Sequence, residues 1–515
     1  MARVNRANLL IGLITGGALL LRLPGFTDSL WFDEIWSTRV ILGSVASTVR
    51  MLGSDLHPPV FNVLMFVWIR IFGDSEVSVR VLPLICGLAT IVLTARLAID
   101  YGSRPAAPVA ALVMAMSPAH IWYSQESRAY SFLMMLVVAS VVVFHRIRET
   151  HATRWYVVYA ALATAMVFTQ YFAALYVAAT ALFALRDPHA RVRVWSIGAA
   201  IACLLAVFLA VKWKWGMVPT GSGYLRTFRV VDLWKLPFEW LLVGGVLGAA
   251  AKRSVAIRVS LLAARGVLLM FTVRGLLKSR PAGELALLLF GLPLALLAIG
   301  FLGPDHFYIE RSGLTILPFL AVAIGIGAMS LTRAPWRASA VAIIAAFGAV
   351  VLINYYPKRD EWTVYKPRAD WRSAAARMAD EQAQLGRPLV IVVMGPALEL
   401  RYYNAGFGPE SLEPPAKSPH TSAFRERLKR LFEVPIDPRR GTTGRVYEIY
   451  EPNVSLVHRV LAREQTRELI LVRNSMTVDW SMKMIALLQA DPGLRVEPLA
   501  ETKGIRLFRI RQNGV

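Results

Sequence analysis

Two adjacent carboxylates, Asp33 and Glu34, come shortly after the first strongly apolar stretch of the chain. Elsewhere the apolar stretches contain few carboxylates. Because an ionisable group near hydrocarbon is costly, such groups usually serve chemistry or transport. A helix cap is the alternative role, although a cap does not require two carboxylates. Asp33 and Glu34 are therefore the first candidates for a functional site.

Two further polar clusters also follow apolar stretches. The first contains Asp55 and His57 ahead of two prolines, and the second contains Gln125, Glu126 and Arg128. The first could simply start a helix, because proline is common in the first turn. The second could be an interfacial ion pair of little energetic consequence. If all three clusters lie on one face of a membrane, they can form one site.

These residue types suit the transfer of a sugar from a phosphate carrier to a hydroxyl or amine. The acceptor needs a base, the leaving phosphate needs positive charge or a metal, and the sugar needs orienting hydrogen bonds. Asp33 or Glu34 could be the base, and Glu126 could orient the acceptor or bind a metal. The candidates that could meet the phosphate or a metal are His57, Arg128, His306 and Arg311.

The composition places these clusters in a membrane protein. Hydrophobic residues make up 56% of the 515, charged residues make up 18%, and the mean hydropathy is +0.49, whereas about 25% of residues are charged in ordinary soluble domains. The net charge of +23 is spread between apolar runs, which is typical of cytoplasmic loops against anionic lipid and argues against a nucleic-acid partner. Cys86 and Cys203 lie in apolar runs, which excludes a disulfide framework or a structural zinc site.

Segments of about 20 apolar residues cross a bilayer, and the pattern predicts about 11 such helices, within a range of about 10 to 13. The predicted spans are Ala7–Leu23, Val77–Ile99, Pro105–Tyr123, Ala129–His145, Trp155–Gln170, Tyr171–Leu185, Trp195–Trp213, Ile257–Leu277, Glu284–Leu302, Gly313–Leu331 and Ala338–Tyr356. Two stretches, Trp31–Met51 and Val60–Phe72, are predicted to lie on the membrane surface. Phe238–Ala251 is either another surface helix or a further crossing.

Positive charge in short loops marks the cytoplasmic side. This rule puts the N-terminus in the cytoplasm and all three acidic clusters on the opposite face. Residues 1–356 are predicted to form the membrane domain, with a first external loop at 24–76. Residues 357–515 are more charged and alternate strand-like and helical patterns, which predicts a small extracytoplasmic α/β domain. We expect this domain either to cap the membrane domain or to hold an acceptor.

Several motifs resemble the superfamily of dolichyl-phosphate-mannose protein mannosyltransferases and aminoarabinose transferases, which are GT-C glycosyltransferases. The matching stretches are Trp31–Glu34, Asp55–Pro59, Phe72–Glu76 with Arg80, Ser117–Tyr130, Thr169–Phe172, Tyr308–Arg311 and Asp370–Arg372. They span most of the chain and are densest in its first third. The resemblance implies a GT-C fold in an α-helical polytopic membrane protein, located in a bacterial inner membrane.

The resemblance also implies roles for particular residues. Asp33 corresponds to the proposed general base, Glu34 to its catalytic neighbour and Glu126 to the second acid. Residues expected to bind substrate are Asp55, His57, Gln125, Arg128, Tyr130, Gln170, Tyr171, Tyr308 and Arg311. Gln170 departs from the pattern, because related chains often have histidine there.

The implied substrates are a polyprenyl-phosphate sugar and an extracytoplasmic acceptor, which is a glycolipid, a polysaccharide or a protein. A divalent cation, magnesium or manganese, is optional in the superfamily, and Glu126, His57 and His306 are its candidate ligands. Two other classes remain open. A transporter or lipid flippase would use the carboxylates for ion coupling, although such proteins place ionisable groups near the bilayer midplane. A non-catalytic assembly partner would tolerate alanine at Asp33 and Glu126.

Overall fold

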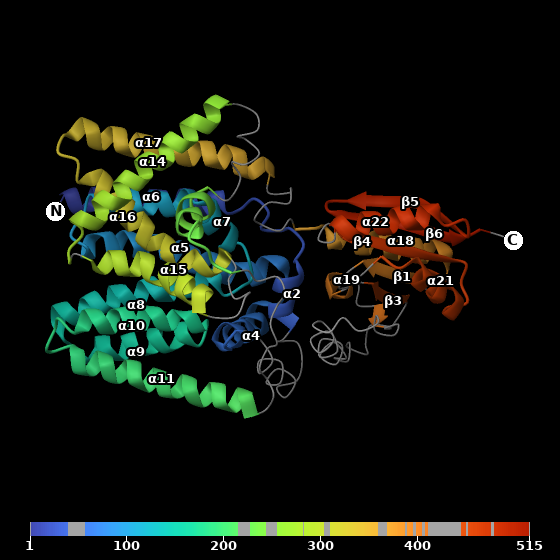
Figure 1. The fold of residues 1–515 in the computed structure, drawn as a ribbon, viewed down its shortest axis with the longest axis horizontal. Helices are drawn as coiled ribbons and strands as arrows, with labels where there is room; N and C mark the ends of the chain where they lie inside the picture. Colours follow the sequence, from blue (N-terminus) through green and yellow to red (C-terminus); the bar gives the residue numbers. More distant parts are fainter. Residues whose placement is uncertain are drawn as a thin grey trace. The chain divides into compact units, whose positions relative to one another are not determined.

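The chain forms two compact units in the computed structural model (Figure 1). The first consists of Met1–Phe26, Val40–Arg359 and Thr363–Tyr365, and the second consists of Thr27–Arg39, Asp360–Trp362 and Lys366–Val515. The structure describes residues 2–39, 57–214, 227–243, 255–281, 283–302, 310–358, 368–386, 389–394, 398–403, 407–409, 444–449, 452–474 and 478–513.

The first unit is a bundle of apolar helices. Its principal helices are α1 (Ala2–Leu21), α4 (Val60–Phe72), α5 (Glu76–Asp100), α6 (Ala106–Met116), α7 (Pro118–Tyr123), α8 (Tyr130–Thr150), α9 (Thr153–Val167), α10 (Ala174–Ala184), α11 (Arg191–Lys214), α14 (Val255–Lys278), α15 (Glu284–Leu302), α16 (Leu317–Met329) and α17 (Ala334–Tyr355). Among the described residues, five segments are long and apolar enough to cross a membrane: Glu76–Asp100, Tyr130–Thr150, Arg191–Lys214, Arg311–Met329 and Ala334–Tyr355. The predicted class, a polytopic α-helical membrane protein, is confirmed.

One predicted span is broken in two. The stretch Pro105–Tyr123 forms α6 and α7, which are separated at Ser117. Proline disfavours helical backbone in the residue before it, and Ser117 is accordingly extended ahead of Pro118. Its hydroxyl oxygen accepts a hydrogen bond from the His120 amide at 3.3 Å. Ser117 therefore caps α7, and this short helix leads into the second acidic motif.

Helix α16 lies at the centre of the bundle, and its residues are almost all buried. A helix that is apolar on every side is typical of such a position. Its crossing with α14 is very close: a Cβ added to Gly275 would lie 1.8 Å from the Ala323 carbonyl oxygen, and one added to Gly327 would lie 1.8 Å from that of Phe271. Small residues at membrane helix crossings permit this approach of two backbones.

The basic loops meet at one end of the bundle. Arg148, at the end of α8, binds both carboxylate oxygens of Glu284 at 3.0 Å, and Glu284 begins α15. The amide of Arg280, before α15, donates to the carbonyl oxygen of Tyr101 after α5. Arg274, near the end of α14, donates to the carbonyl oxygen of Ser330 after α16. The basic segments at the ends of α8 and α14 therefore lie at the same end of the bundle as the loops after α5 and α16.

The loops predicted to be external meet at the opposite end. The amide of Val60 at the start of α4 donates to the Phe168 carbonyl oxygen after α9. The side chain of Gln125 after α7 donates to the Pro24 carbonyl oxygen after α1. The hydroxyl of Tyr356 after α17 donates to the Leu21 carbonyl oxygen. The ends of at least four helices of the first unit are thereby linked at this end of the bundle.

Of the segments predicted to lie on the surface, α4 is fully described. It buries Phe61, Met65 and Ile69 along one side and exposes Val67 and Ile71 on the other. Its membrane-surface position stays a prediction. Of Trp31–Met51, the structure describes residues 31–39, which include α2 (Phe32–Arg39). Of Phe238–Ala251 it describes residues 238–243, which begin within the π-helix η2 (Leu236–Leu241).

The second unit is built on a six-stranded sheet with the order β2-β3-β1-β4-β6-β5. The strands are β1 (Leu389–Met394), β2 (Phe407–Pro409), β3 (Gly444–Ile449), β4 (Glu468–Asn474), β5 (Leu494–Thr502) and β6 (Ile505–Gln512). The first four are parallel, whereas β6 and β5 are antiparallel to their neighbours. The accompanying helices are α18 (Trp371–Leu385), α19 (Leu398–Tyr403), α21 (Val454–Arg463) and α22 (Val478–Ala490).

Both faces of this sheet are covered by helices. On one face Ile391 and Val393 pack with Trp371 of α18, and on the other Val392 packs with Val460 of α21. Successive strand residues point to opposite faces, so the unbroken apolar run of β1 is what a strand buried on both sides requires. The predicted α/β domain at the C-terminus is confirmed.

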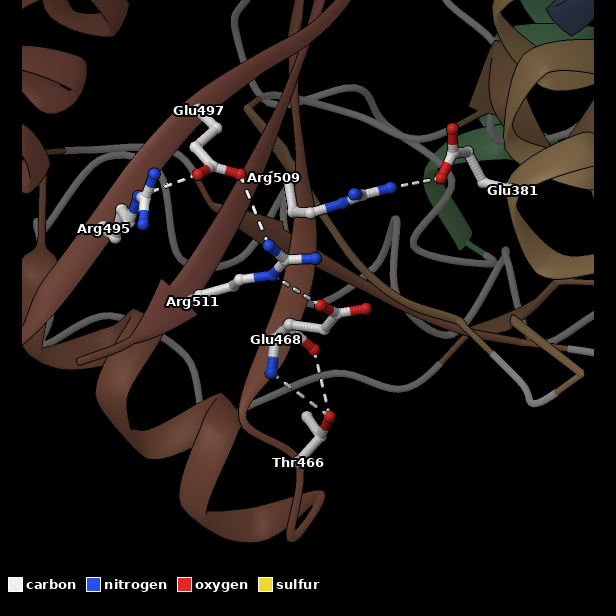
Figure 2. Close-up of polar contacts among 7 residues, drawn as sticks. All are labelled: Glu381, Thr466, Glu468, Arg495, Glu497, Arg509 and Arg511. Carbon is white, nitrogen blue, oxygen red and sulfur yellow. Dashed lines mark hydrogen bonds and ion pairs between the residues drawn. The ribbon is translucent and has the colours of Figure 1, made fainter. Parts of the chain in front are cut away.

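Charged pairs align the antiparallel strands (Figure 2). Arg511 on β6 pairs with Glu468 on β4 at 2.9 Å and with Glu497 on β5 at 3.5 Å. Arg509 on β6 also pairs with the buried Glu381 of α18. Cross-strand pairs of this kind favour one register, and charges on the edge strand β5 discourage pairing with another chain.

Candidate functional site

The first acidic pair lies at the start of α2 in the second unit. Glu34 is the third residue of the helix, and its carboxylate accepts a hydrogen bond from the Trp31 amide at 3.4 Å. A glutamate in this position that reaches back to the N-cap amide is half of a capping box. Glu34 is completely buried, whereas Asp33 is partly exposed. Of the two carboxylates, Asp33 is the more accessible to a substrate.

The second acidic motif follows α7 in the first unit. The indole N–H of Trp122 donates to the Glu126 carboxylate at 3.0 Å, and Glu126 is 1% exposed. The amide group of Gln125 donates to the carbonyl oxygens of Arg22 at 2.5 Å and Pro24 at 3.0 Å. The main chain turns sharply here, because the Arg128 amide donates to the Glu126 carbonyl oxygen at 2.7 Å. The three predicted residues Gln125, Glu126 and Arg128 thus share one tight loop tied to the end of α1.

Beneath this loop lies a buried pair that sequence reasoning missed. A guanidinium nitrogen of Arg22 lies 2.6 Å from Nδ1 of His120, and both residues are fully buried. The guanidinium also donates to the carbonyl oxygens of Ala18 and Ala115. Because arginine has no acceptor, Nδ1 of His120 must accept, so the imidazole is neutral. An arginine at the end of an apolar helix was the available signal, since ionisable groups in such places seldom lack a role.

An aromatic and cationic group lies beside the same loop. The guanidinium carbon of Arg311 lies 5.6 Å from the ring centre of Tyr130. Tyr130 also meets Tyr123 edge to face, with ring centroids 4.9 Å apart. Cations are attracted to the face of an aromatic ring. Two predicted substrate-binding residues, Tyr130 and Arg311, are therefore brought together although they are far apart in the sequence.

A third part of the site joins His57 to Gln170 through the main chain. Val60, three residues after His57, donates its amide to Phe168, two residues before Gln170. Gln170 is 3% exposed, and its side-chain oxygen accepts no hydrogen bond from the part of the chain that the structure describes. Tyr171 follows directly and begins the 3-10 turn η1 (Tyr171–Ala173).

The remaining predicted residues, Asp55, His306 and Tyr308, lie outside the described residues. Within the described ranges, no group of three or more histidine, cysteine, aspartate or glutamate side chains gathers as metal ligands. Of the predicted ligands, Glu126 and His57 fall in those ranges and His306 does not, so the metal site stays a prediction.

These features define the class: a multi-pass membrane protein with polar loops joined at one end of its helical bundle and an α/β domain near its C-terminus. Residues 56–215 match the family described as dolichyl-phosphate-mannose-protein mannosyltransferase. A comparison with curated proteins gives no match.

Solved structures share the fold over the whole chain. ArnT from Cupriavidus metallidurans in the apo state is 12% identical, with a TM-score of 0.59 and coverage of 99% of this chain and 98% of that one. The same protein bound to undecaprenyl phosphate gives 12% identity, a TM-score of 0.56 and 97% coverage of both chains. The Archaeoglobus fulgidus oligosaccharyltransferase tethered to an acceptor peptide gives 10% identity, a TM-score of 0.50 and coverage of 99% and 74%. The chain therefore shares the fold of these proteins, while the family match covers less than half of its length.

Proposed function

We propose that the protein is a glycosyltransferase that moves a sugar from a polyprenyl-phosphate carrier to an acceptor outside the cytoplasm. One observation carries the proposal: the acidic loop of Glu126 and the Arg311–Tyr130 pair lie at the same end of an apolar bundle. An acid, a guanidinium group and aromatic rings are the groups that a phosphate-linked sugar requires. The acceptor class is a glycolipid, a polysaccharide or a protein.

A lipid-linked donor suits a site at the end of membrane helices. Each methylene buried in hydrocarbon contributes about 0.8 kcal/mol, so a long polyprenyl tail stays in the bilayer and the catalytic loops must come to it. One solved structure with this fold has undecaprenyl phosphate bound. We therefore assign a polyprenyl phosphate as the leaving group.

In the proposed reaction, the Asp33 carboxylate takes the proton from the acceptor hydroxyl or amine. The acceptor atom then attacks the anomeric carbon on the side opposite the phosphate, and the bond from that carbon to the phosphate oxygen breaks. The polyprenyl phosphate leaves with the bonding electrons, and the anomeric configuration inverts. Arg128 and Arg311 balance the charge on the phosphate, while Glu126 orients the acceptor.

A donor panel tests the proposed function. Purified protein in liposomes, given polyprenyl phosphates that carry different sugars, should release free polyprenyl phosphate in the presence of a suitable acceptor extract. Chromatography of the extracted lipid measures this release. Movement of the intact donor across the bilayer without any release would instead identify a lipid flippase, and no release from any donor would refute the proposal.

Orientation is tested separately. We propose that the end with the basic loops faces the cytoplasm of a bacterial inner membrane, because positive charge in short loops stays inside. In a variant with Cys86 and Cys203 replaced by serine, Glu149→Cys should resist a membrane-impermeant maleimide in spheroplasts. Arg495→Cys, on the exposed face of β5, should react with it. Labelling of Glu149→Cys without lysis would reverse the proposed orientation.

A further inference from the structure

The residues just before Asp33 and Glu34 lie at one edge of the C-terminal sheet, which the surrounding elements identify. Helix α18 ends just before β1 begins, and α19 starts just after β1 ends. Ile505 of β6 pairs with Asn474, the last residue of β4, so the turn between β5 and β6 lies at that same end. The Asp370 amide, before α18, donates to the Lys503 carbonyl oxygen in this turn. These elements mark the carboxyl edge of the parallel strands, where open α/β sheets bind their ligands.

The chain's own residues 27–30 occupy this edge. The Leu30 amide donates to the Tyr403 hydroxyl oxygen of α19 at 2.6 Å, and Leu30 itself is completely buried. The guanidinium group of Arg372 on α18 donates to the Thr27 carbonyl oxygen at 3.0 Å. Two of these four residues are thus held through the main chain, in a way that does not depend on their side chains.

Side chains of the same segment add three further contacts. The Ser29 hydroxyl donates to the Asp370 carboxylate at 3.3 Å and accepts from the Arg372 amide at 3.2 Å. Asp28 pairs with Lys503 at 3.5 Å. Three separate elements of the sheet domain therefore bind four consecutive residues directly ahead of α2.

Asp370 is suited to remain charged in this position. Burial acts to raise its pKa, but hydrogen bonds from Ser373 and Ser29, together with the charge of Arg372, outweigh burial and leave the pKa below its ordinary value. Its carboxylate also caps α18 by accepting from the Ser373 amide at 3.1 Å. One ionised group thus serves both the helix of the domain and the docked segment.

We propose that the carboxyl edge of the C-terminal sheet is a platform for the catalytic segment, and that Tyr403 and Asp370 are positioning residues for Asp33. An eight-residue helix such as α2 is marginal alone, so its place is set by the residues that anchor its start. Asp33 follows Leu30 by three positions. The proposal rests on the proposed role of Asp33 and gives the C-terminal domain a part in catalysis other than holding the acceptor.

The test combines a structural and a kinetic measurement on the full-length protein. Tyr403→Phe keeps the ring and removes the acceptor of the Leu30 amide. Ser29→Ala removes the hydrogen bond to Asp370 and the one from the Arg372 amide, while Asp370 still caps α18. Each variant should exchange amide hydrogens in residues 27–39 at least about fivefold faster, because one hydrogen bond contributes about 1 kcal/mol. Each should also lower kcat by a similar factor while the KM for the donor stays unchanged.

Asp491→Asn is the matched control. Asp491 lies in the same domain and also has a pKa below its ordinary value, because its carboxylate accepts from His458, but it is not among the residues that bind the segment. This variant should leave both measurements at wild-type values. Unchanged exchange in Tyr403→Phe and Ser29→Ala would overturn the docking, and faster exchange with unchanged kcat would overturn the positioning role. If the wild-type protein transfers no sugar, the proposed function is refuted. The hydrogen-exchange measurement still tests whether residues 27–30 dock on the sheet.

Discussion

Asp33→Asn should lower kcat by about a thousandfold, within the range that a general base contributes, while the protein remains folded and inserted in the membrane. Asparagine has nearly the shape of aspartate but cannot accept the acceptor's proton. The partial exposure of Asp33 means that the substitution leaves no charge buried without a partner. Release of polyprenyl phosphate under saturating donor measures the effect.

Glu34→Gln provides the comparison that makes this prediction specific. The buried Glu34 carboxylate accepts from the Trp31 amide, and a glutamine oxygen can accept the same hydrogen bond. The expected loss of kcat is therefore about tenfold or less, in line with the loss of a favourable charge at a helix N-terminus, which contributes about 1 kcal/mol. Equal losses in the two variants would contradict the assignment of Asp33 as the base, and so would near-normal turnover of Asp33→Asn.

The membrane architecture was predictable from the sequence because one physical requirement dominates it. Every backbone polar group in hydrocarbon must be paired inside its own helix, so long apolar runs such as Glu284–Leu302 can be recognised without knowledge of their neighbours. The basic loops were recognisable for a similar reason. Arg148 and Arg186 are far from Glu284 in the sequence, yet both approach it in the structure, and each of the arginines also belongs to a short positively charged loop.

The different environments of the two adjacent carboxylates were harder to predict from the sequence. Sequence alone presents Asp33 and Glu34 as equivalent neighbours, and their difference depends on the turn at Trp31 that directs Glu34 back to the main chain. The docking of residues 27–30 on the sheet could not be predicted from the sequence either. It depends mainly on backbone groups of Thr27 and Leu30, which leave no pattern in the residue types. The Arg22–His120 pair was missed because Arg22 follows α1 whereas His120 lies in α7, far away in the sequence.

The largest effect on stability is expected at the crossing of α14 and α16. Gly275→Ala would place a Cβ 1.8 Å from the Ala323 carbonyl oxygen, and a backbone atom cannot move aside as a flexible side chain can. We expect a loss of about 3 kcal/mol, the upper part of the usual range for overpacking, which would lower the apparent Tm of the purified protein and the yield of monodisperse material.

Gly266→Ala is the matched control on the same helix, because nothing lies within 4 Å of a Cβ added there. Alanine favours a helix over glycine by about 1 kcal/mol, so this variant should keep or raise the apparent Tm. The two substitutions are chemically identical and differ in what the new methyl group meets, so opposite shifts would establish the backbone contact between α14 and α16. If Gly275→Ala had the Tm of the wild type, the two helices could not cross as closely as the structure places them.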